Sequence, residues 1–365
     1  MRWSITIGSF GGTAVKIHIT FILFLVWIAF SGWTRGGAAA ALDSTVFIVL
    51  LFACVVLHEF GHIAAARRYG INTPEVTLLP IGGVASLQRL PSDPAQELVV
   101  ALAGPAVNLV IGLVLIAALG SAHPGDLEQI DNPNLSLLGR LAVANIFLVV
   151  FNLIPAFPMD GGRVLHALLA MRVGGPRATE IAARIGQALA FGLGFLGLFG
   201  NPLLLFIAIF VYIAAGGEAQ MSAAHEALNG VSVGDAMETR FTPVSIDANL
   251  AQAVDALLAT AQHEFPVVDA FGKPVGLLTR DDILTAVREH GGEEPAAKFM
   301  RSGVESVRAA DPVQGLFERL QDPGAAALYV TDAAGKIIGL LTRHALAEVV
   351  MIRAARPDWR FDRKA

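Results

Sequence analysis

The chain has 365 residues, of which 54% are hydrophobic and only 16% are charged, and its mean hydropathy is +0.60. This composition excludes an ordinary soluble globular protein of this length and indicates a membrane protein. The formal net charge is -5. Residues 1–215 carry 11 Lys and Arg against 10 Asp and Glu, and residues 216–365 carry 15 against 21, so no clustered basic surface favours nucleic acid as a partner.

Six apolar stretches approach the roughly 20 residues that a helix needs to cross a bilayer. They lie at about residues 17–34, 45–66, 96–119, 137–156, 181–199 and 201–215. With the N-terminus in the cytoplasm, the arginines after the second and fourth stretches lie inside and the acidic segment 121–136 lies outside, as the positive-inside rule requires. The first stretch lacks a small-residue cleavage site, so we read it as an uncleaved span. We predict a multi-pass protein of the inner cell membrane whose N-terminus and residues 216–365 are cytoplasmic.

The segment between the second and third stretches predicts a short β-hairpin. Thr73–Leu90 holds two strand-like runs that are separated by Pro80, Gly82 and Gly83. An exposed edge of such a hairpin could pair with an extended peptide by strand addition. A structural loop that caps the helices is an equally good interpretation of the same residues.

The second stretch contains the sequence His58-Glu59-Phe60-Gly61-His62. Two histidines four residues apart share one face of a helix and can bind one zinc ion, and Glu59 between them can take a proton from an attacking water. A carboxylate in a membrane span costs roughly a few kcal/mol, so its presence needs a reason, which metal binding supplies. Cys54 is the only cysteine, so a thiolate-rich zinc site is excluded.

A catalytic zinc usually has three protein ligands, so the two histidines need a partner from elsewhere in the chain. Asp160 is the best candidate, because Pro155 and Pro158 interrupt the fourth stretch just before it. Irregular backbone at membrane depth is tolerated where it lines a cavity or is buried in protein. Asp160 could instead be the N-cap of a helix over residues 161–171, and the residues alone do not decide between these interpretations.

The third stretch contains the run Ala103-Gly104-Pro105-Ala106-Val107-Asn108. Small residues in a membrane helix allow a neighbouring helix to approach closely, and an asparagine can form a hydrogen bond across such an interface. We therefore expect Asn108 to have a structural rather than a catalytic role.

The C-terminal part has a soluble α/β pattern and repeats itself. Residues 269–280 read DAFGKPVGLLTR and residues 332–343 read DAAGKIIGLLTR, and Met237 and Met300 keep the same offset of 63 residues. A repeat of this kind predicts two copies of one unit that share a core. We divide the chain into a membrane region, a linker, two repeated units and a charged tail, at residues 1–215, 216–230, 231–290, 294–353 and 354–365.

In these motifs the chain resembles the site-2 proteases, which are intramembrane zinc metalloproteases, and specifically their branch with C-terminal CBS domains. The HExxH motif at 58–62 and an NxxPxxPxDG pattern at 152–161 occur in the family's order and on separate spans. Met159 stands where the family usually has leucine, an apolar exchange. The resemblance implies a polytopic α-helical membrane protein of about six spans with a short β-hairpin, followed by a cytosolic α/β tandem CBS module.

The resemblance also implies roles for individual residues and a class of substrate. It assigns one zinc per chain to His58, His62 and Asp160, makes Glu59 the general base, and has Asn152 assist by hydrogen bonding to the substrate backbone or the oxyanion. The implied activity is endopeptidase cleavage of membrane-tethered regulators such as anti-sigma factors or sigma-factor precursors. A substrate helix would have to unwind locally, because its carbonyls are otherwise held in internal hydrogen bonds.

The repeated tail resembles a tandem of CBS domains, which commonly bind adenosine nucleotides in the cleft between them. The first copy keeps the family's Thr-x-x-Asp as Thr279 and Asp282, which typically contact phosphate and ribose, whereas the second copy has Ala345 at the aspartate position. The resemblance implies one site for ATP, ADP or AMP that modulates activity, and a homodimer formed through the CBS domains. The alternative is a CBS pair that serves only for dimerisation or substrate docking.

A competing interpretation is a CBS-regulated channel or transporter whose intramembrane polar residues line an ion path. The predicted spans show no internal repeat and no second ring of charge, which disfavours it. A catalytically silent scaffold is also disfavoured, because every expected catalytic residue is present.

Overall fold

The computed structural model describes residues 3–80, 82–86, 91, 93–119, 136–321, 324–356 and 359–361. Arg89, nearly all of the segment 121–136 that we expect outside, and part of the tail 354–365 lie outside the described residues. The chain divides into two compact units, Met1–Gln220 and Met221–Ala365. The first unit combines long apolar helices with one sheet, and the second is α/β. The predicted fold class is therefore confirmed.

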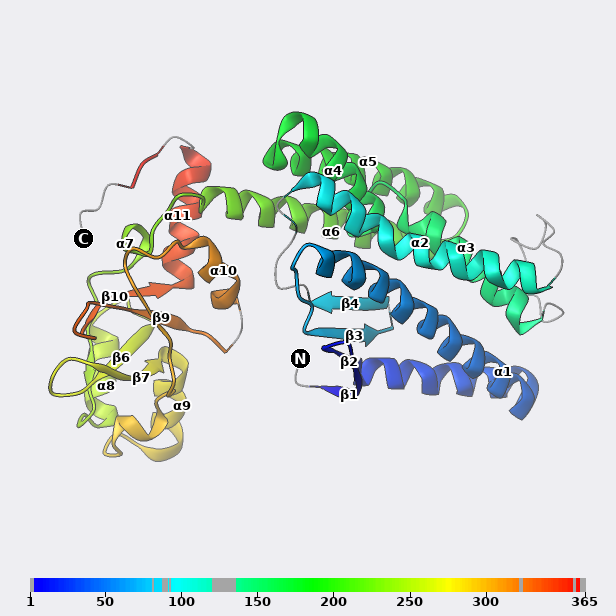
Figure 1. The fold of residues 1–365 in the computed structure, drawn as a ribbon. Coiled ribbons are helices and arrows are strands. Elements are labelled where there is room, and N and C mark those ends of the chain that lie inside the picture. Colours follow the sequence, from blue (N-terminus) through cyan, green and yellow to red (C-terminus); the bar gives the residue numbers. More distant parts are fainter. Residues whose placement is uncertain are drawn as a thin grey trace. The chain divides into compact units, whose positions relative to one another are not determined.

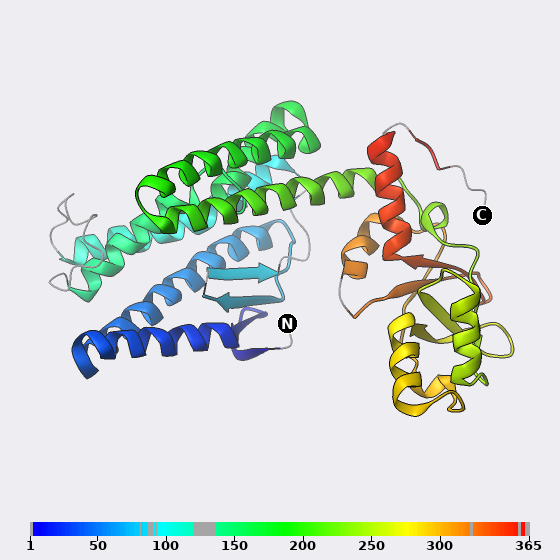
Figure 2. The ribbon, with the colours of Figure 1, turned by 180° about the vertical axis from the view of Figure 1, so that it is seen from behind.

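The described residues of the first unit form the helices α1 (Ile19–Arg68), α2 (Pro94–Leu119), α3 (Leu137–Asn152), α4 (Asp160–Val173), α5 (Gly175–Phe199) and the greater part of α6 (Pro202–Ala227). Helix α1 is broken in the middle, where Gly36 and Gly37 leave helical geometry and Gly37 has a φ of 71°. Only glycine adopts such a positive φ without strain. The two halves of α1 consequently fold back on each other, as both ribbon views show (Figures 1 and 2).

Four helices among the described residues, α1, α2, α5 and α6, are long and apolar enough to cross a membrane. The break in α1 separates the first two predicted spans. Helix α3 has 16 residues and ends at Asn152, before the predicted limit of 156, because the chain turns towards Pro155. Helix α6 continues to Ala227, so most of the predicted linker 216–230 is helical. After its two glycines that segment consists mainly of good helix formers, so the helix continues to Ala227, and Gly230 follows in a turn with a φ of 70°.

The sheet of the first unit has the strand order β1-β2-β3-β4. Its strands are β1 (Ser4–Phe10), β2 (Thr13–His18), β3 (Glu75–Leu79) and β4 (Gly82–Ser86). Strands β3 and β4 form the predicted antiparallel hairpin. Strand β2 leads directly into α1 and pairs with β3 in parallel, Ala14 opposite Glu75, after the whole of α1 has intervened. The side chains of Val76 and Leu78 are buried beneath this sheet.

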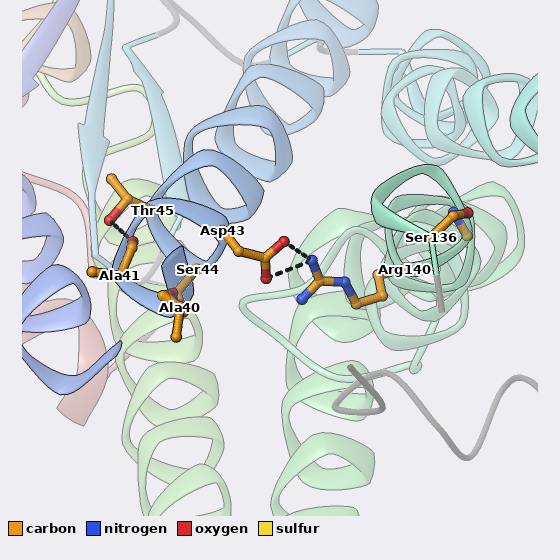
Figure 3. Close-up of polar contacts among 8 residues, drawn as sticks. Ala40, Ala41, Asp43, Ser44, Thr45, Ser136 and Arg140 are labelled. Carbon is orange, nitrogen blue, oxygen red and sulfur yellow. Dashed lines mark hydrogen bonds and ion pairs between the residues drawn. The ribbon is translucent and has the colours of Figure 1, made fainter. Parts of the chain in front are cut away.

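A polar clamp joins α1 to α3 close to the break in α1. The Arg140 guanidinium donates to both carboxylate oxygens of Asp43, at 2.6 and 2.7 Å (Figure 3). It also lies over the ring of Phe47, 5.0 Å from the centroid. Ser136 caps α3 by accepting a hydrogen bond from the Gly139 amide. Both hydrogen bonds come from the single nitrogen Nη2, and together with the contact to Phe47 they hold the start of α3 beside α1.

The second unit contains two three-stranded sheets, with strand orders β5-β6-β7 and β10-β9-β8. Its elements are α7 (Val233–Ala236), β5 (Val244–Ser245), α8 (Leu250–Ala259), β6 (Glu264–Val268), β7 (Pro274–Thr279), α9 (Arg280–His290), η2 (Ala296–Phe299), β8 (Ser306–Val307), α10 (Gln314–Gln321), β9 (Ala327–Thr331), β10 (Ile337–Thr342) and α11 (Arg343–Ala355). The two sheets are copies of one another, as the sequence repeat predicts.

The two repeats exchange their opening segments. Glu238, near the start of the first repeat, forms two backbone hydrogen bonds with Leu340 of the second. Arg301, near the start of the second repeat, forms the same two bonds with Leu277 of the first. All four residues obey the 63-residue offset of the sequence repeat. Each repeat is therefore completed by a strand-like segment of the other, and the pair folds as one unit.

Candidate active site

The two motif histidines lie on one face of the second half of α1 and are buried, with 6% and 9% of their surfaces exposed. The Nδ1 atom of His62 lies 2.7 Å from the backbone oxygen of Val100 on α2. A carbonyl can only accept, so Nδ1 carries the proton and the Nε2 lone pair is free. The helix thus presents this ring with its metal-binding nitrogen turned inward.

Asp160 is the first residue of α4, and its carboxylate faces both histidines. Oδ2 lies 3.2 Å from Nε2 of His58, and Oδ1 lies 3.3 Å from Nε2 of His62. The N-cap of α4 is Met159, which makes no side-chain capping bond. The alternative in which Asp160 caps the helix is therefore wrong, and the carboxylate belongs to the histidine cluster.

The donor set fits a divalent metal ion. One ligand atom from each of His58, His62 and Asp160 lies within 4.8 Å of the others, and the two Nε2 atoms are 3.1 Å apart. With Nδ1 of His62 protonated, its Nε2 lone pair faces a second imidazole nitrogen and a carboxylate, an arrangement that is repulsive without a cation. Two imidazoles and one carboxylate also match the ligand set of a catalytic zinc site, which leaves one position for water or substrate.

Helix α2 comes unusually close to this cluster at Gly104. A Cβ atom at Gly104 would lie 2.7 Å from Nε2 of His58 and even nearer to the ring of His62. Real Cβ atoms essentially never make such contacts, so only glycine leaves room for both rings. Val100, whose carbonyl holds His62, lies one helical turn earlier on the same face of α2.

The cluster opens into a cavity of about 420 Å³. It is lined by residues of α1, α2, α3, α4 and α6 and by the β3–β4 hairpin. Glu59 and Asn152, the two predicted catalytic side chains, both line it. Asn108, to which we gave a purely structural role, lines it as well. A Cβ at Gly83 of β4 would lie 2.7 Å from Cγ of Glu59, so the backbone of β4 passes directly beside the glutamate.

A second polar pair ties the Asp160 helix to α2. His166 on α4 places Nδ1 2.9 Å from one carboxylate oxygen of Glu97 and 3.0 Å from the other. Its Nε2 lies 3.4 Å from the backbone oxygen of Gly175. Both side chains are mostly buried. Sequence reasoning did not find this pair, because its members are 69 residues apart.

The predicted nucleotide residues Thr279 and Asp282 lie at the start of α9, where they form a capping box. The Arg301 guanidinium donates to both oxygens of Asp282, at 2.9 and 3.0 Å. Burial alone would raise the pKa of Asp282, but hydrogen bonds from Arg301 and Thr279 outweigh it and hold the pKa below its usual range. The stability that this pair adds is therefore present above the ordinary carboxylate pKa and is lost as the pH falls.

A cavity of about 570 Å³ in this unit lies beside that pair. It is lined by Arg301, Arg319, Glu305 and Glu318 and by small residues of the segments 302–304 and 324–327. Thr279 and Asp282 do not line it. Arg301 connects the two places, since it borders the cavity and holds Asp282, and the sequence pattern gave no sign of it.

Comparisons with known proteins bear on both units. The profile of peptidase family M50 matches residues 46–126 and 125–193, and that of the CBS domain matches 233–289 and 296–352. The chain is 35% identical to zinc metalloprotease MJ0392 of Methanocaldococcus jannaschii over 283 residues, which cover 76% of this chain and 78% of the relative. The chain belongs to peptidase family M50. It is a zinc metalloprotease with membrane-spanning helices and two CBS domains.

Two further similarities extend along this M50 chain. Rip3 of Mycobacterium tuberculosis is 28% identical over 387 residues, which cover 98% of this chain and 96% of the relative. The solved structure of the site-2 protease from Methanocaldococcus jannaschii is 39% identical, with a TM-score of 0.46, and the match covers 60% of this chain and 95% of that one. The M50 profile match includes His58, His62 and Asp160, so it covers all three residues of the metal-binding cluster.

The contact between α2 and the histidines gives a first prediction. In the Gly104→Ala variant we expect zinc affinity to fall by about 10- to 100-fold, because the new methyl group displaces the ligand rings. Zinc content after dialysis against a graded chelator measures this change. Gly112→Ala is the matched control on the same helix, since its Cβ would meet only the flexible end of Ile146. Equal zinc retention in the two variants would contradict the role of Gly104.

Proposed function

We propose that this protein is an intramembrane zinc endopeptidase that performs regulated proteolysis of membrane-tethered regulators, such as anti-sigma factors or sigma-factor precursors. One observation carries the proposal. His58, His62 and Asp160 converge beside Glu59 in a cavity that is walled by apolar, membrane-spanning helices. A hydrolytic site in that place meets substrates that are themselves in the membrane.

The residues of the cavity divide the chemical work. His58, His62 and Asp160 would hold a zinc ion, which would lower the pKa of an attacking water and polarise the scissile carbonyl. Glu59 takes the proton from that water and passes it to the leaving amine. Asn152, at the end of α3 and on the cavity wall, donates a hydrogen bond to the substrate backbone or to the oxyanion.

Strand β4 is suited to bind an unwound substrate segment in an extended conformation. It is an edge strand of the four-stranded sheet, and its residues Gly82 and Gly83 line the cavity next to Glu59. A substrate segment that unwinds loses its internal hydrogen bonds and needs new partners, which the free edge of a strand supplies. The substrate would then lie as an added strand with its carbonyls near the zinc ligands.

The CBS pair gives this activity a regulatory input. We propose that an adenine nucleotide binds in the cavity beside Arg301 and modulates proteolysis, and that two chains associate through their CBS domains. The guanidinium groups of Arg301 and Arg319 at the cavity are suited to phosphate. An even number of spans would place the N-terminus and the CBS pair on the same side of the membrane, and we propose that this side is the cytoplasm, where such nucleotides are found.

Cleavage itself is tested with Glu59→Gln. Wild type and this variant are co-expressed with tagged single-span substrates, and the released soluble fragment is measured. Loss of the general base should lower the cleavage rate by about 10²- to 10⁴-fold, with zinc content and expression unchanged. Retained cleavage in Glu59→Gln would overturn the mechanism. Zinc binding without cleavage of any substrate by the wild type would instead favour a silent scaffold.

The nucleotide site is tested by calorimetry on the full chain with AMP, ADP and ATP. We expect Arg301→Ala to weaken binding about tenfold, because a charged hydrogen bond to phosphate is lost. Asp282→Ala should also weaken binding, since Asp282 orients that guanidinium. Asp281→Ala is the matched control, because the Asp281 carboxylate is next to Asp282 in the sequence but is exposed and makes no hydrogen bond to Arg301. Identical affinities in all four proteins would reject this site.

A further inference from the structure

Asn108 is buried in a way that points to a missing partner. Only 1% of its surface is exposed, and its Oδ1 atom has no hydrogen-bond partner among the described residues. It lies near the middle of α2, which spans Pro94–Leu119 and is apolar enough to cross a membrane. Leaving an amide oxygen unpaired at such a depth costs about 1–3 kcal/mol. A ligand that pairs with this oxygen would recover that cost.

The side of Asn108 on which a partner could bind is the cavity that holds the zinc ligands. Val100, Gly104 and Asn108 are spaced by four residues and form one stripe on α2. Val100 holds His62, Gly104 faces both histidine rings, and Asn108 lines the same cavity about 6 Å further along the helix. The polar group thus lies on the wall where a bound peptide would continue past the zinc ligands.

We propose that Asn108 binds the backbone of the unwound substrate one or two residues away from the scissile bond. A carboxamide offers one acceptor and two donor hydrogens, so it can pair with both the N–H and the C=O of a peptide unit. Peptide units of a helix that has unwound in an apolar environment need such a partner. This assignment rests on the proposed endopeptidase function and adds a substrate-binding residue to it.

Binding is measured apart from chemistry by using the inactive Glu59→Gln protein and a fluorescent single-span substrate. Adding Asn108→Ala should weaken substrate binding about tenfold, the value of one lost hydrogen bond. Zinc content should stay unchanged, and the melting temperature should be equal or higher, because an unpaired buried amide has been removed. A residue with a merely structural role would lower the melting temperature and leave the affinity unchanged.

Asn145 on α3 provides the matched control. It is fully buried, its Oδ1 is also unpaired, and it does not line the cavity. Equal substrate affinities in the Asn108→Ala and Asn145→Ala proteins would overturn the assignment of Asn108. If the Glu59→Gln parent retained no substrate at all, the proposed function itself would fail, which is a distinguishable result.

A different observation concerns the outer strand of the sheet. Strand β1 and the residue before it expose four large apolar side chains: Trp3 at 71%, Ile5 at 56%, Ile7 at 58% and Phe10 at 61%. Single exposed apolar residues are normal, but four on one short strand form a patch that needs a partner.

The strand register shows that this patch continues a buried surface. Ile5 lies opposite Ile17, and Ile17 lies opposite Leu78. Directly opposed residues share a face of the sheet, and Ile17 and Leu78 pack against α1. The opposite face is polar there, where Thr6 lies opposite Lys16, which is ion-paired with Glu75. The sheet is therefore amphipathic, and α1 leaves its apolar face uncovered at β1.

We propose that the patch formed by Trp3, Ile5, Ile7 and Phe10 inserts into the interfacial layer of the bilayer. The first turns of α1 also expose apolar side chains, at Ile19, Ile22 and Leu23. The Ile19 amide, at the start of that helix, donates to the Trp3 carbonyl, so the strand lies level with the point where α1 begins. Tryptophan and branched apolar residues are favoured at this depth. The strand would fix how deep the whole sheet, including β4, lies relative to the membrane.

The single native cysteine makes the test direct. In a Cys54→Ala background, spin labels are attached at Ile5→Cys or, on the polar face, at Thr6→Cys, and the full chain is placed in lipid nanodiscs. The label at 5 should be accessible to oxygen and protected from a water-soluble nickel reagent, and the label at 6 should show the reverse. Equal nickel accessibility at both positions would overturn the proposal. Protection of position 5 from both reagents would overturn it too, since a protein partner would then cover the strand.

Discussion

The structure depends on one close contact, the approach of α2 to the histidine face of α1 at Gly104. Polar ligands inside a bilayer are tolerated only when every one of them is held by protein. The absence of a side chain at Gly104 lets α2 supply the Val100 carbonyl to His62 and brings Asn108 to the cavity wall. The zinc ligands, their orientation and the substrate cavity therefore follow from the packing of two helices.

The remaining ligand enters through a break in the helical pattern. The chain leaves helix at Asn152 and resumes it at Asp160, and the intervening turn contains Pro155 and Pro158. This turn places Asn152 and Asp160 on the same cavity although they belong to different helices. The pair of His166 and Glu97 then anchors the Asp160 helix to α2, and α2 also holds His62 through the Val100 carbonyl. A rigid frame of this kind keeps the ligand geometry while a substrate enters.

The sequence could predict those features that depend on residues close together along the chain. The four-residue spacing of the histidines predicted a shared helix face, and the prolines before Asp160 predicted a break in the helix. The 63-residue repeat predicted two copies of one unit. The structure has all three features. Long-range partners were not predictable. The parallel pairing of Ala14 with Glu75 joins residues on either side of a 50-residue helix, and nothing local encodes it. For Asn108, the spacing from Gly104 predicts a shared helix face but does not tell whether that face meets a neighbouring helix or a cavity.

The two CBS repeats place different charges at equivalent positions, and this makes the pair asymmetric. Arg301 in one repeat corresponds to Glu238 in the other. In the first site, the Thr279 hydroxyl and Arg301 both donate to Asp282; in the second, Thr342 donates to Glu238, which replaces the carboxylate lost at Ala345. A guanidinium beside a cavity attracts a phosphate, whereas a carboxylate repels it. The repeats are otherwise alike and exchange their opening segments, so this difference gives the pair a guanidinium at one of the two equivalent positions and a carboxylate at the other.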